Sequence, residues 1–204
     1  MRRSNLSLIL TIGLCIHPAF GKELGVAPND ARLADNPPPT EVEVRDPQAF
    51  FDETFNELEQ ELEIAQEEGK SGLLIMFEMD DCPFCYRMKQ TVLNRGDVQD
   101  YYRKHFRIIS VDIEGDLELT DFQGKTTTQK EFALKQHRVR ATPVFLFFDL
   151  EGNPVRNGRL TGATKNAGEF LLLGRYIVER HNDSQSFFRF KREQAKSATD
   201  EQKG

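Results

Sequence analysis

Two cysteines, Cys82 and Cys85, are separated by Pro83 and Phe84 in a C-x-x-C spacing. An apolar run at 73–77 precedes the pair, and a predicted helix follows it. The first sulfur therefore lies at a helix N-terminus, where unpaired N–H groups and the helix dipole favour an anion. We expect Cys82 to ionise more readily than a free thiol, and Cys85, one turn later, to close a small disulfide ring with it.

Three kinds of site use such a pair: a zinc half-site, a structural bridge and a redox dithiol. Zinc usually takes four cysteine or histidine ligands, and the sequence holds no second C-x-x-C and no H-x-x-x-H. A structural bridge gains stability chiefly by closing a long loop, and this loop is very short. The spacing therefore favours thiol–disulfide exchange, with metal transfer and structural bridging as the alternatives.

The N-terminus has the pattern of a signal peptide at 1–21. Arginines precede an apolar run at 6–16 that is too short to span a bilayer comfortably, and small residues surround a predicted cleavage site after Gly21. Cys15 lies within this segment, so its removal leaves the C-x-x-C pair as the only thiols. We therefore predict a periplasmic protein with no stable membrane insertion after the signal is removed.

Charge and composition limit the class of partner. The 204 residues carry a formal net charge of -6, so the chain has no electrostatic footprint for nucleic acid. Charged residues are mixed with apolar ones, which argues against general disorder. The expected organisation after the signal is a Pro-rich linker at 22–45, one domain at 46–181 and a polar tail at 182–204.

Apolar periodicity predicts an α/β domain with a central mixed sheet. A helix should begin at Asp46 and Pro47 and end at Gly69, with an apolar stripe of Phe51, Phe55, Leu58, Leu62 and Ala65. Further helices are expected at 86–94, 98–105, 129–137 and 169–178, and strands at 73–77, 106–113, 144–148 and 155–160. The first two strands should be parallel and the last two a hairpin. Residues 114–128 predict a hairpin or loop inserted before the helix at 129–137. Phe187, Phe188 and Phe190 predict a short helix that packs its phenylalanines on the domain.

This order of elements, with C-x-x-C at the first strand-to-helix turn and a proline just before the hairpin, resembles the thioredoxin fold over roughly 46–180. Within that superfamily the chain looks most like exported single-domain thioredoxins, the SoxW-like periplasmic proteins. The segments that carry this likeness are 81–85, 115–122, 140–143 and 172–176.

The resemblance implies a cis bond between Thr142 and Pro143 that faces the dithiol, with Pro83 and Phe84 beside it in the substrate-binding surface. A proline that opens a strand withdraws one N–H from the ladder, which would let a client backbone dock there. The sequence departs from the family pattern at two places, since Met76 stands where a buried acid is common and Asp81 replaces the usual tryptophan. Glu78, Asp80 and Asp81 are therefore the candidates for a proton relay.

We predict that the protein reduces disulfides of exported client proteins. Strong oxidants of the superfamily have a histidine between the cysteines, whereas this sequence has Pro83 and Phe84 there and acidic residues just before Cys82. This difference predicts a pair that is more reducing than the strong periplasmic oxidants. No G-x-G-x-x-G fingerprint is present, so we expect no bound cofactor and a membrane electron donor. One alternative is a copper-handling or client-binding module with the same two cysteines as ligands, and another is an oxidase.

Overall fold

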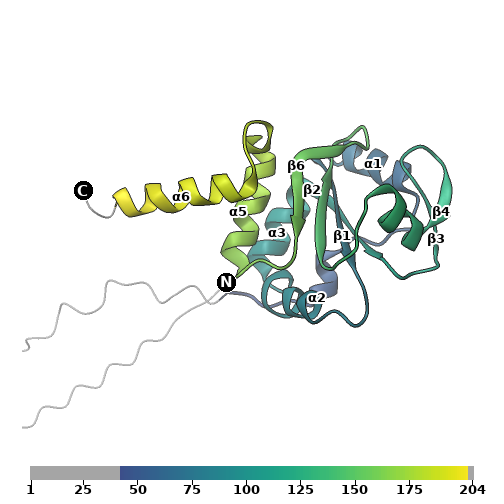
Figure 1. The fold of residues 1–204 in the computed structure, drawn as a ribbon, viewed down its shortest axis with the longest axis horizontal. Coiled ribbons are helices and arrows are strands. Elements are labelled where there is room, and N and C mark those ends of the chain that lie inside the picture. The colour runs from purple at the N-terminus through teal and green to yellow at the C-terminus, as the bar shows by residue number, and fades with distance from the viewer. Residues whose placement is uncertain (1–41, 202–204) are drawn as a thin grey trace, which may run out of the picture. The chain divides into compact units, whose positions relative to one another are not determined.

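A computed structural model describes residues 42–201, with side chains as far as Ser197. The predicted signal peptide (1–21) and residues 22–41 of the predicted linker lie outside the described residues. The strands are β1 (Gly72–Glu78), β2 (Phe106–Asp112), β3 (Glu118–Thr120), β4 (Thr126–Thr128), β5 (Val144–Phe148) and β6 (Pro154–Thr161) (Figure 1). The helices are η1 (Pro47–Phe50), α1 (Leu58–Glu67), α2 (Pro83–Met88), η2 (Lys89–Leu93), α3 (Gly96–His105), α4 (Gln129–Glu131), η3 (Phe132–Gln136), α5 (Ala167–Val178), η4 (His181–Asp183) and α6 (Phe187–Glu201).

Four strands form one mixed sheet in the order β2-β1-β5-β6. β1 is parallel to β2 from the pair Gly72 and Phe106 onward, and antiparallel to β5, which is antiparallel to β6. The parallel first pair and the hairpin of β5 and β6 confirm two sequence predictions. β1 is central and buried as far as Phe77, as its continuous apolar run requires of a strand covered on both faces.

The sheet separates two hydrophobic cores because successive side chains of a strand point to opposite faces. One core packs helices α2, α3 and α5 on the sheet, and its members include Leu74, Met76, Cys82, Cys85, Met88, Tyr102, Phe145 and Phe170. The other core packs α1 and η3 on the opposite face, and its members include Leu58, Leu62, Ile75, Phe77, Val111, Phe132 and Phe148. The two cysteines therefore belong to the first core.

The N-terminal helix is shorter than predicted. Asp46 does cap the chain by accepting a hydrogen bond from Gln48 N at 2.9 Å, but only the four residues of η1 follow. The chain then runs extended beside β2, where Asp52 N donates to Ile108 O at 2.7 Å and Ile108 N donates to the Asp52 carboxylate at 2.8 Å. The predicted helix is therefore wrong before Leu58, and Phe55, expected on its apolar stripe, is 89% exposed.

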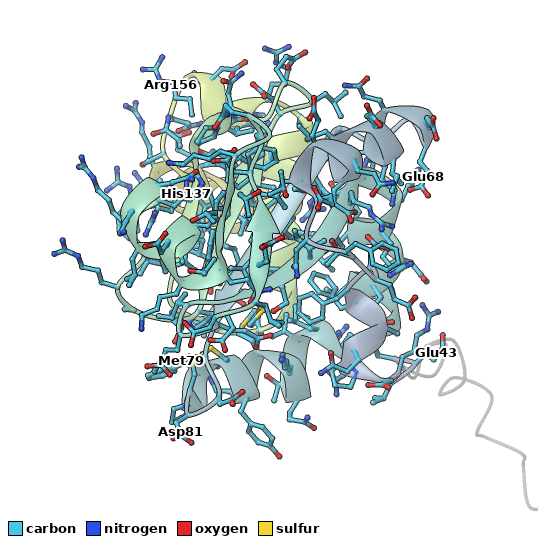
Figure 2. All side chains as sticks on the ribbon, turned by 90° about the vertical axis from the view of Figure 1, so that its right-hand side faces the viewer. Glu43, Glu68, Met79, Asp81, His137 and Arg156 are labelled. Atoms are coloured by element: carbon cyan, nitrogen blue, oxygen red, sulfur yellow. A yellow bond between two sulfur atoms is a disulfide. The ribbon has the colours of Figure 1, made fainter. Side chains whose placement is uncertain are left out.

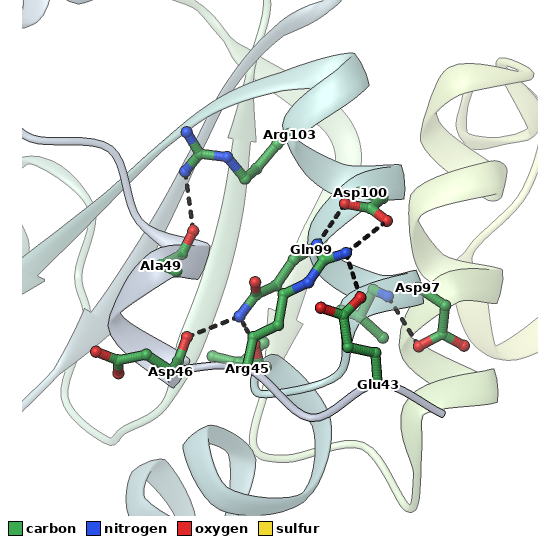
Figure 3. A network of polar contacts seen from close by, with 10 residues as sticks. Glu43, Arg45, Asp46, Ala49, Asp97, Gln99, Asp100 and Arg103 are labelled. Carbon is green, nitrogen blue, oxygen red and sulfur yellow. Dashed lines mark hydrogen bonds and ion pairs between the residues drawn. The ribbon is translucent and has the colours of Figure 1, made fainter. Parts of the chain in front are cut away.

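A network of arginines fixes this N-terminal segment to α3 and β2. Arg45 pairs with Glu43 and with Asp100 of α3, and Arg103 Nη1 donates to Ala49 O at 3.0 Å (Figure 3). Val44 forms a β-bridge with Arg95, so contacts with the domain begin before the predicted boundary at residue 46.

The insertion between β2 and α4 is a hairpin, in agreement with the sequence. β3 and β4 pair antiparallel, and Leu119 is buried in the second core. Phe122, which follows β3, packs on Phe148 of β5 with the ring centroids 4.7 Å apart. Because the insertion follows the carboxyl end of β2, it starts at the edge of the sheet where β1 also ends.

The predicted polar tail contributes to the packing of the domain. Phe187 and Phe190 of α6 are buried, and both rings contact Tyr176 of α5 at 5.4 Å between centroids. Phe188 points outward and is largely exposed. Within residues 42–201, every helix is too short or too polar to cross a membrane.

Candidate functional site

The cysteine pair lies where β1 ends and α2 begins. Cys82 is the residue before the first helical residue, and its Sγ accepts a hydrogen bond from Cys85 N at 3.0 Å. Pro83 occupies the first helical position, where the helix needs no N–H donor. The two cysteines form a disulfide with their Cα atoms 5.2 Å apart. When the pair is reduced, the same N–H and the helix dipole favour a thiolate at Cys82.

The two sulfur-bearing residues are nearly covered, whereas their neighbours are not. Cys82 is 5% exposed and Cys85 is 3% exposed, but Phe84 between them is 59% exposed. Tyr86, which follows Cys85, is also exposed. A partner that approaches the disulfide from solvent therefore finds two exposed aromatic rings next to it.

A hollow of about 280 Å³ opens beside the disulfide, and we name it the dithiol hollow. Its walls come from the end of β1 and the loop after it, from α2 and η2, from the end of β2 and from α4. The lining residues are Glu78, Met79, Asp80, Cys82, Cys85, Tyr86, Lys89, Ser110, Asp112 and Gln129.

Glu78 holds the best-defined carboxylate of the dithiol hollow. Its Oε2 lies 2.6 Å from Lys89 Nζ, and its Oε1 accepts a short hydrogen bond from Ser110 Oγ. Lys89 is four residues after Cys85 on the same helical segment, so the two side chains share one face. Both partners of the ion pair are mostly covered, and Glu78 is thus fixed and electrically compensated beside the sulfurs.

Asp80 and Asp112 are the uncompensated charges of the dithiol hollow, since neither forms an ion pair with any residue within 42–201. Asp112 is held in place, because its N–H donates to Gln129 Oε1 at 3.0 Å and its Oδ1 accepts from Glu114 N at 2.9 Å. The charged lining is therefore three carboxylates against one ammonium group. Asp81 is exposed at the edge of the domain, near Met79 (Figure 2).

Thr142 and Pro143 lie at the same end of the sheet but on the other side of β1. The register pairs Phe77 of β1 with Val144, so the residues just before Val144 lie beside the end of β1. The bond between Thr142 and Pro143 is cis, and Pro143 O accepts from Gly162 N at 2.8 Å. Thr142 Oγ1 is buried with no hydrogen-bond partner among the described residues. Since β5 and β2 flank β1 on opposite sides, these two residues do not line the dithiol hollow.

A larger hollow of about 1130 Å³ shares no lining residue with the dithiol hollow. We name it the arginine groove, because Arg45, Arg103 and Arg107 line it together with Phe51, Asp52, Phe55, Gln99 and Asp100. It contains no cysteine and no histidine. The only hollow of the two with groups suited to redox chemistry is therefore the small one.

A family model of thioredoxin-like domains matches residues 58–177, which include the cysteine pair, Thr142 and Pro143. The chain belongs to this thioredoxin-like family. No curated protein matches it.

Among similar solved structures, one with a TM-score above 0.5 supports the fold. A thioredoxin-fold protein from Helicobacter pylori is 18% identical, with a TM-score of 0.56 over 76% of this chain and 94% of that chain. A putative disulphide-isomerase from Bacteroides thetaiotaomicron is 27% identical, with a TM-score of 0.47 over 62% of this chain and 93% of that chain. The family match and the first structure confirm the predicted α/β fold, a mixed sheet flanked by helices.

In this thioredoxin-like protein, the structure brings together four of the residues predicted from the sequence. Cys82, Cys85, Glu78 and Asp80 line one hollow. The remaining candidates, Asp81, Pro83, Phe84, Thr142 and Pro143, adjoin the pair in sequence or lie at the same end of the sheet but outside the lining.

Sequence reasoning missed several lining residues of the dithiol hollow. Lys89 could have been found from its helical spacing to Cys85. Ser110 and Asp112 could have been found from the parallel register, which places them opposite Met76 and Glu78. No local pattern indicates Gln129, because its place depends on how the inserted hairpin returns to β2.

Proposed function

We propose that this thioredoxin-like protein is a periplasmic thiol–disulfide oxidoreductase that reduces disulfides of exported client proteins. The observation that carries the proposal is the disulfide of Cys82 and Cys85 at the start of α2, beside a hollow that contains a fixed carboxylate. Export rests on the signal-peptide pattern at 1–21. The closer likeness to SoxW-like thioredoxins is part of the same proposal.

The proposed reaction moves two electrons from the reduced pair to the client. The Cys82 thiolate attacks one client sulfur, a mixed disulfide forms, and the other client sulfur leaves as a thiolate that takes a proton. Cys85 then loses its proton and attacks the Cys82 sulfur, which releases the second client thiol. The client ends as a dithiol, and Cys82 and Cys85 end as a disulfide. A membrane electron donor then restores the reduced pair.

We assign the proton relay at Cys85 to Glu78. Residues two apart on a strand point to the same face, so Glu78 projects on the side of Met76, where the family often has its acid. Its carboxylate is held by Lys89 and Ser110 in the hollow that Cys85 also lines. Asp80 is also exposed but lines the same hollow and is a second relay candidate, whereas Asp81 is exposed and lies outside the lining.

We assign client binding to Pro83, Phe84, Thr142 and Pro143. The exposed ring of Phe84 offers apolar contact area next to the sulfurs. Thr142 Oγ1 has no partner among the described residues, and the chain at Pro143 has no N–H to place in a ladder. A client segment added there as a short strand would run past the disulfide.

The direct test is reduction of insulin by the dithiothreitol-reduced protein. Wild type should precipitate the insulin B chain, Cys82→Ser should be inactive, and Cys85→Ser should retain client as a mixed disulfide that dithiothreitol releases. A Cys85→Ser variant that traps no client would overturn the proposal. Equilibration of the pair in a dithiothreitol redox buffer tests direction, since a potential near that of strong periplasmic oxidants would contradict the reductase assignment.

A copper-handling module is the second candidate, because the thioether residue Met79 lines the dithiol hollow with both cysteines. Met76 and Met88, also close in sequence, are fully buried in the core. Titration of the reduced protein with Cu(I) against a chelator separates the two functions: tight binding that Met79→Leu weakens, in a protein inactive on insulin, would favour the carrier.

A further inference from the structure

Resting on the proposed disulfide exchange, we propose that the dithiol hollow selects clients with a lysine or arginine side chain beside the disulfide. The hollow is lined by both cysteine residues, so a side chain inside it is close to the reacting sulfurs. The client group that enters belongs to a residue adjacent, or nearly so, to the attacked cysteine.

The charge balance of the hollow is the first argument. Lys89 is matched by Glu78 at 2.6 Å, which leaves Asp80 and Asp112 without a cation within residues 42–201. Two carboxylates that share one concave site repel each other, and a cation placed between them removes that repulsion. A client ammonium or guanidinium group supplies this charge, whereas an anionic group adds to the repulsion.

The fixed position of Asp112 is the second argument, since Asp80 is exposed on the loop after β1. Asp112 ends β2, and its backbone and side chain are both hydrogen-bonded, to Gln129 and Glu114. Gln129 is itself buried and donates to Asn56 Oδ1 at 3.1 Å. Asp112 is therefore positioned by the fold, and a client cation meets its carboxylate without rearrangement of β2.

The polar groups of the same wall suit an ammonium or guanidinium donor. Ser110 and Gln129 contribute a hydroxyl and an amide to the lining, and the largely exposed Tyr86 adds an aromatic ring to it. Cationic groups bind well to carboxylates and to the faces of aromatic rings. The exposed Phe84 lies outside the hollow and adds apolar contact without charge preference.

Three small symmetric disulfides of similar size test the inference: cystamine is cationic, 2-hydroxyethyl disulfide is neutral and 3,3'-dithiodipropionate is anionic. The measured quantity is the second-order rate constant for oxidation of the reduced, desalted protein, divided by that of dithiothreitol with the same compound. This division removes differences in intrinsic reactivity. We expect cystamine to exceed the neutral compound by about fivefold and the anionic one to fall below it by a similar factor at low salt. High salt should shrink both ratios.

Matched variants locate the preference. Asp112→Asn and Asp80→Asn should each lower the ratio of cystamine to the neutral disulfide by about threefold. Glu151→Gln removes the same charge from the exposed turn between β5 and β6, outside the dithiol hollow, and should leave the ratio unchanged. Equal normalised rates for the three compounds, or equal effects of Asp112→Asn and Glu151→Gln, would overturn the inference alone. No reaction with the neutral disulfide would overturn the proposed function itself.

Discussion

The dithiol hollow and the arginine groove differ in what their charges face. In the arginine groove, Arg45 pairs with Glu43 and Asp100, and Arg103 and Arg107 both pair with Asp52. In the dithiol hollow, which has about a quarter of the volume, Asp80 and Asp112 form no ion pair within the described chain, and the one lysine of the lining is paired with Glu78. The charged groups of the larger hollow thus neutralise one another through ion pairs, whereas the smaller hollow has two carboxylates, unpaired within residues 42–201, beside the Cys82–Cys85 disulfide. Volume alone would have selected the wrong region.

The ion pairs of the arginine groove connect three segments of the chain. Asp52 is buried, with its carboxylate 3.0 Å from Arg103 and 3.4 Å from Arg107, and Arg107 also lies 2.7 Å from Glu61 of α1. Gln99 adds hydrogen bonds of 2.8 Å to Asp46 O and to Leu93 O. This region therefore fixes the N-terminal segment to α3 and β2, and we expect its variants to change stability rather than redox rates.

The largest expected effect follows from neutralising Asp52. Asp52→Asn leaves Arg107 without one of its two carboxylates in a mostly buried site, which should cost about 3 kcal/mol of unfolding free energy. Urea unfolding measures this loss, and Glu53→Gln, at an exposed neighbour that forms no ion pair within residues 42–201, should change the unfolding free energy by less than about 0.5 kcal/mol. Insulin reduction per folded molecule should be unchanged. A stable Asp52→Asn protein with impaired insulin reduction would reverse the comparison.

The unfolding free energy measured as a function of pH distinguishes the arginine groove from a third site, His137. Burial among the rings of Phe132 and Phe148, with Arg159 nearby, lowers the pKa of His137 to about 4. The unfolded chain binds this proton below about pH 6.5 while the folded chain does not, so stability is greatest above pH 6.5 and falls toward pH 4. Allowing for partial exposure, the loss is about 1–2 kcal/mol. His137→Gln should flatten this window in urea unfolding.

The carboxylates that pair with Arg45 of the arginine groove act at lower pH. Hydrogen bonds from Arg45 lower the pKa of Glu43 and of Asp100 below their ordinary values of 4.5 and 3.8. Their contribution is present above those values and is lost as pH falls through the lowered ones. A His137→Gln protein that loses as much stability as wild type between pH 6.5 and 5 would contradict this division of the pH range, because the smaller lowering of the His105 pKa accounts for only part of that loss.

Asp112→Asn should have a small effect on stability. The asparagine Oδ1 can still accept from Glu114 N, and no ion pair is lost within the described chain, so the unfolding free energy should change by less than about 0.5 kcal/mol. The same variant lowers the preference for cationic disulfides. A loss of several kcal/mol in urea unfolding would show that Asp112 is structural, as Asp52 is, and would remove the contrast between the two regions.

The smallest expected effect concerns Phe55 at the rim of the arginine groove. Its ring is 89% exposed, so Phe55→Ser should change unfolding free energy by less than about 0.5 kcal/mol and leave insulin reduction unaltered. Phe84→Ser is the matched change beside the dithiol and should slow insulin reduction. A severalfold slower reduction in Phe55→Ser would show that the arginine groove binds client, against our interpretation.

Local patterns were enough to predict most of the fold. The apolar run of β1 and the alternation along β2 indicated two buried strands, and their spacing indicated the parallel pair. The predicted N-terminal helix was wrong because its residues near Asp52 are held by β2, more than fifty positions away. Long-range hydrogen bonds of this kind outweigh helical periodicity, and no local window contains them.

The site was predictable where it follows one stretch of chain. Cys82, Cys85, Glu78 and Asp80 lie within eight consecutive positions and were found from the sequence. The opposite wall, Ser110, Asp112 and Gln129, comes from other elements and requires the register of β1 against β2. The near-complete burial of both cysteines was also not predictable, since it depends on packing with Met88 and the sheet.

Cys82 and Cys85 are members of the same packed layer as Ala167 and Phe170 of α5. In a thermodynamic cycle, the difference in folding free energy between the oxidised and reduced proteins equals the difference in the reduction free energy of the disulfide between the folded and unfolded chains. Packing by side chains of α5, away from the exposed face of the pair, can therefore shift the reduction potential of the Cys82–Cys85 disulfide. Pro83 and Phe84, between the cysteines, determine only part of that potential.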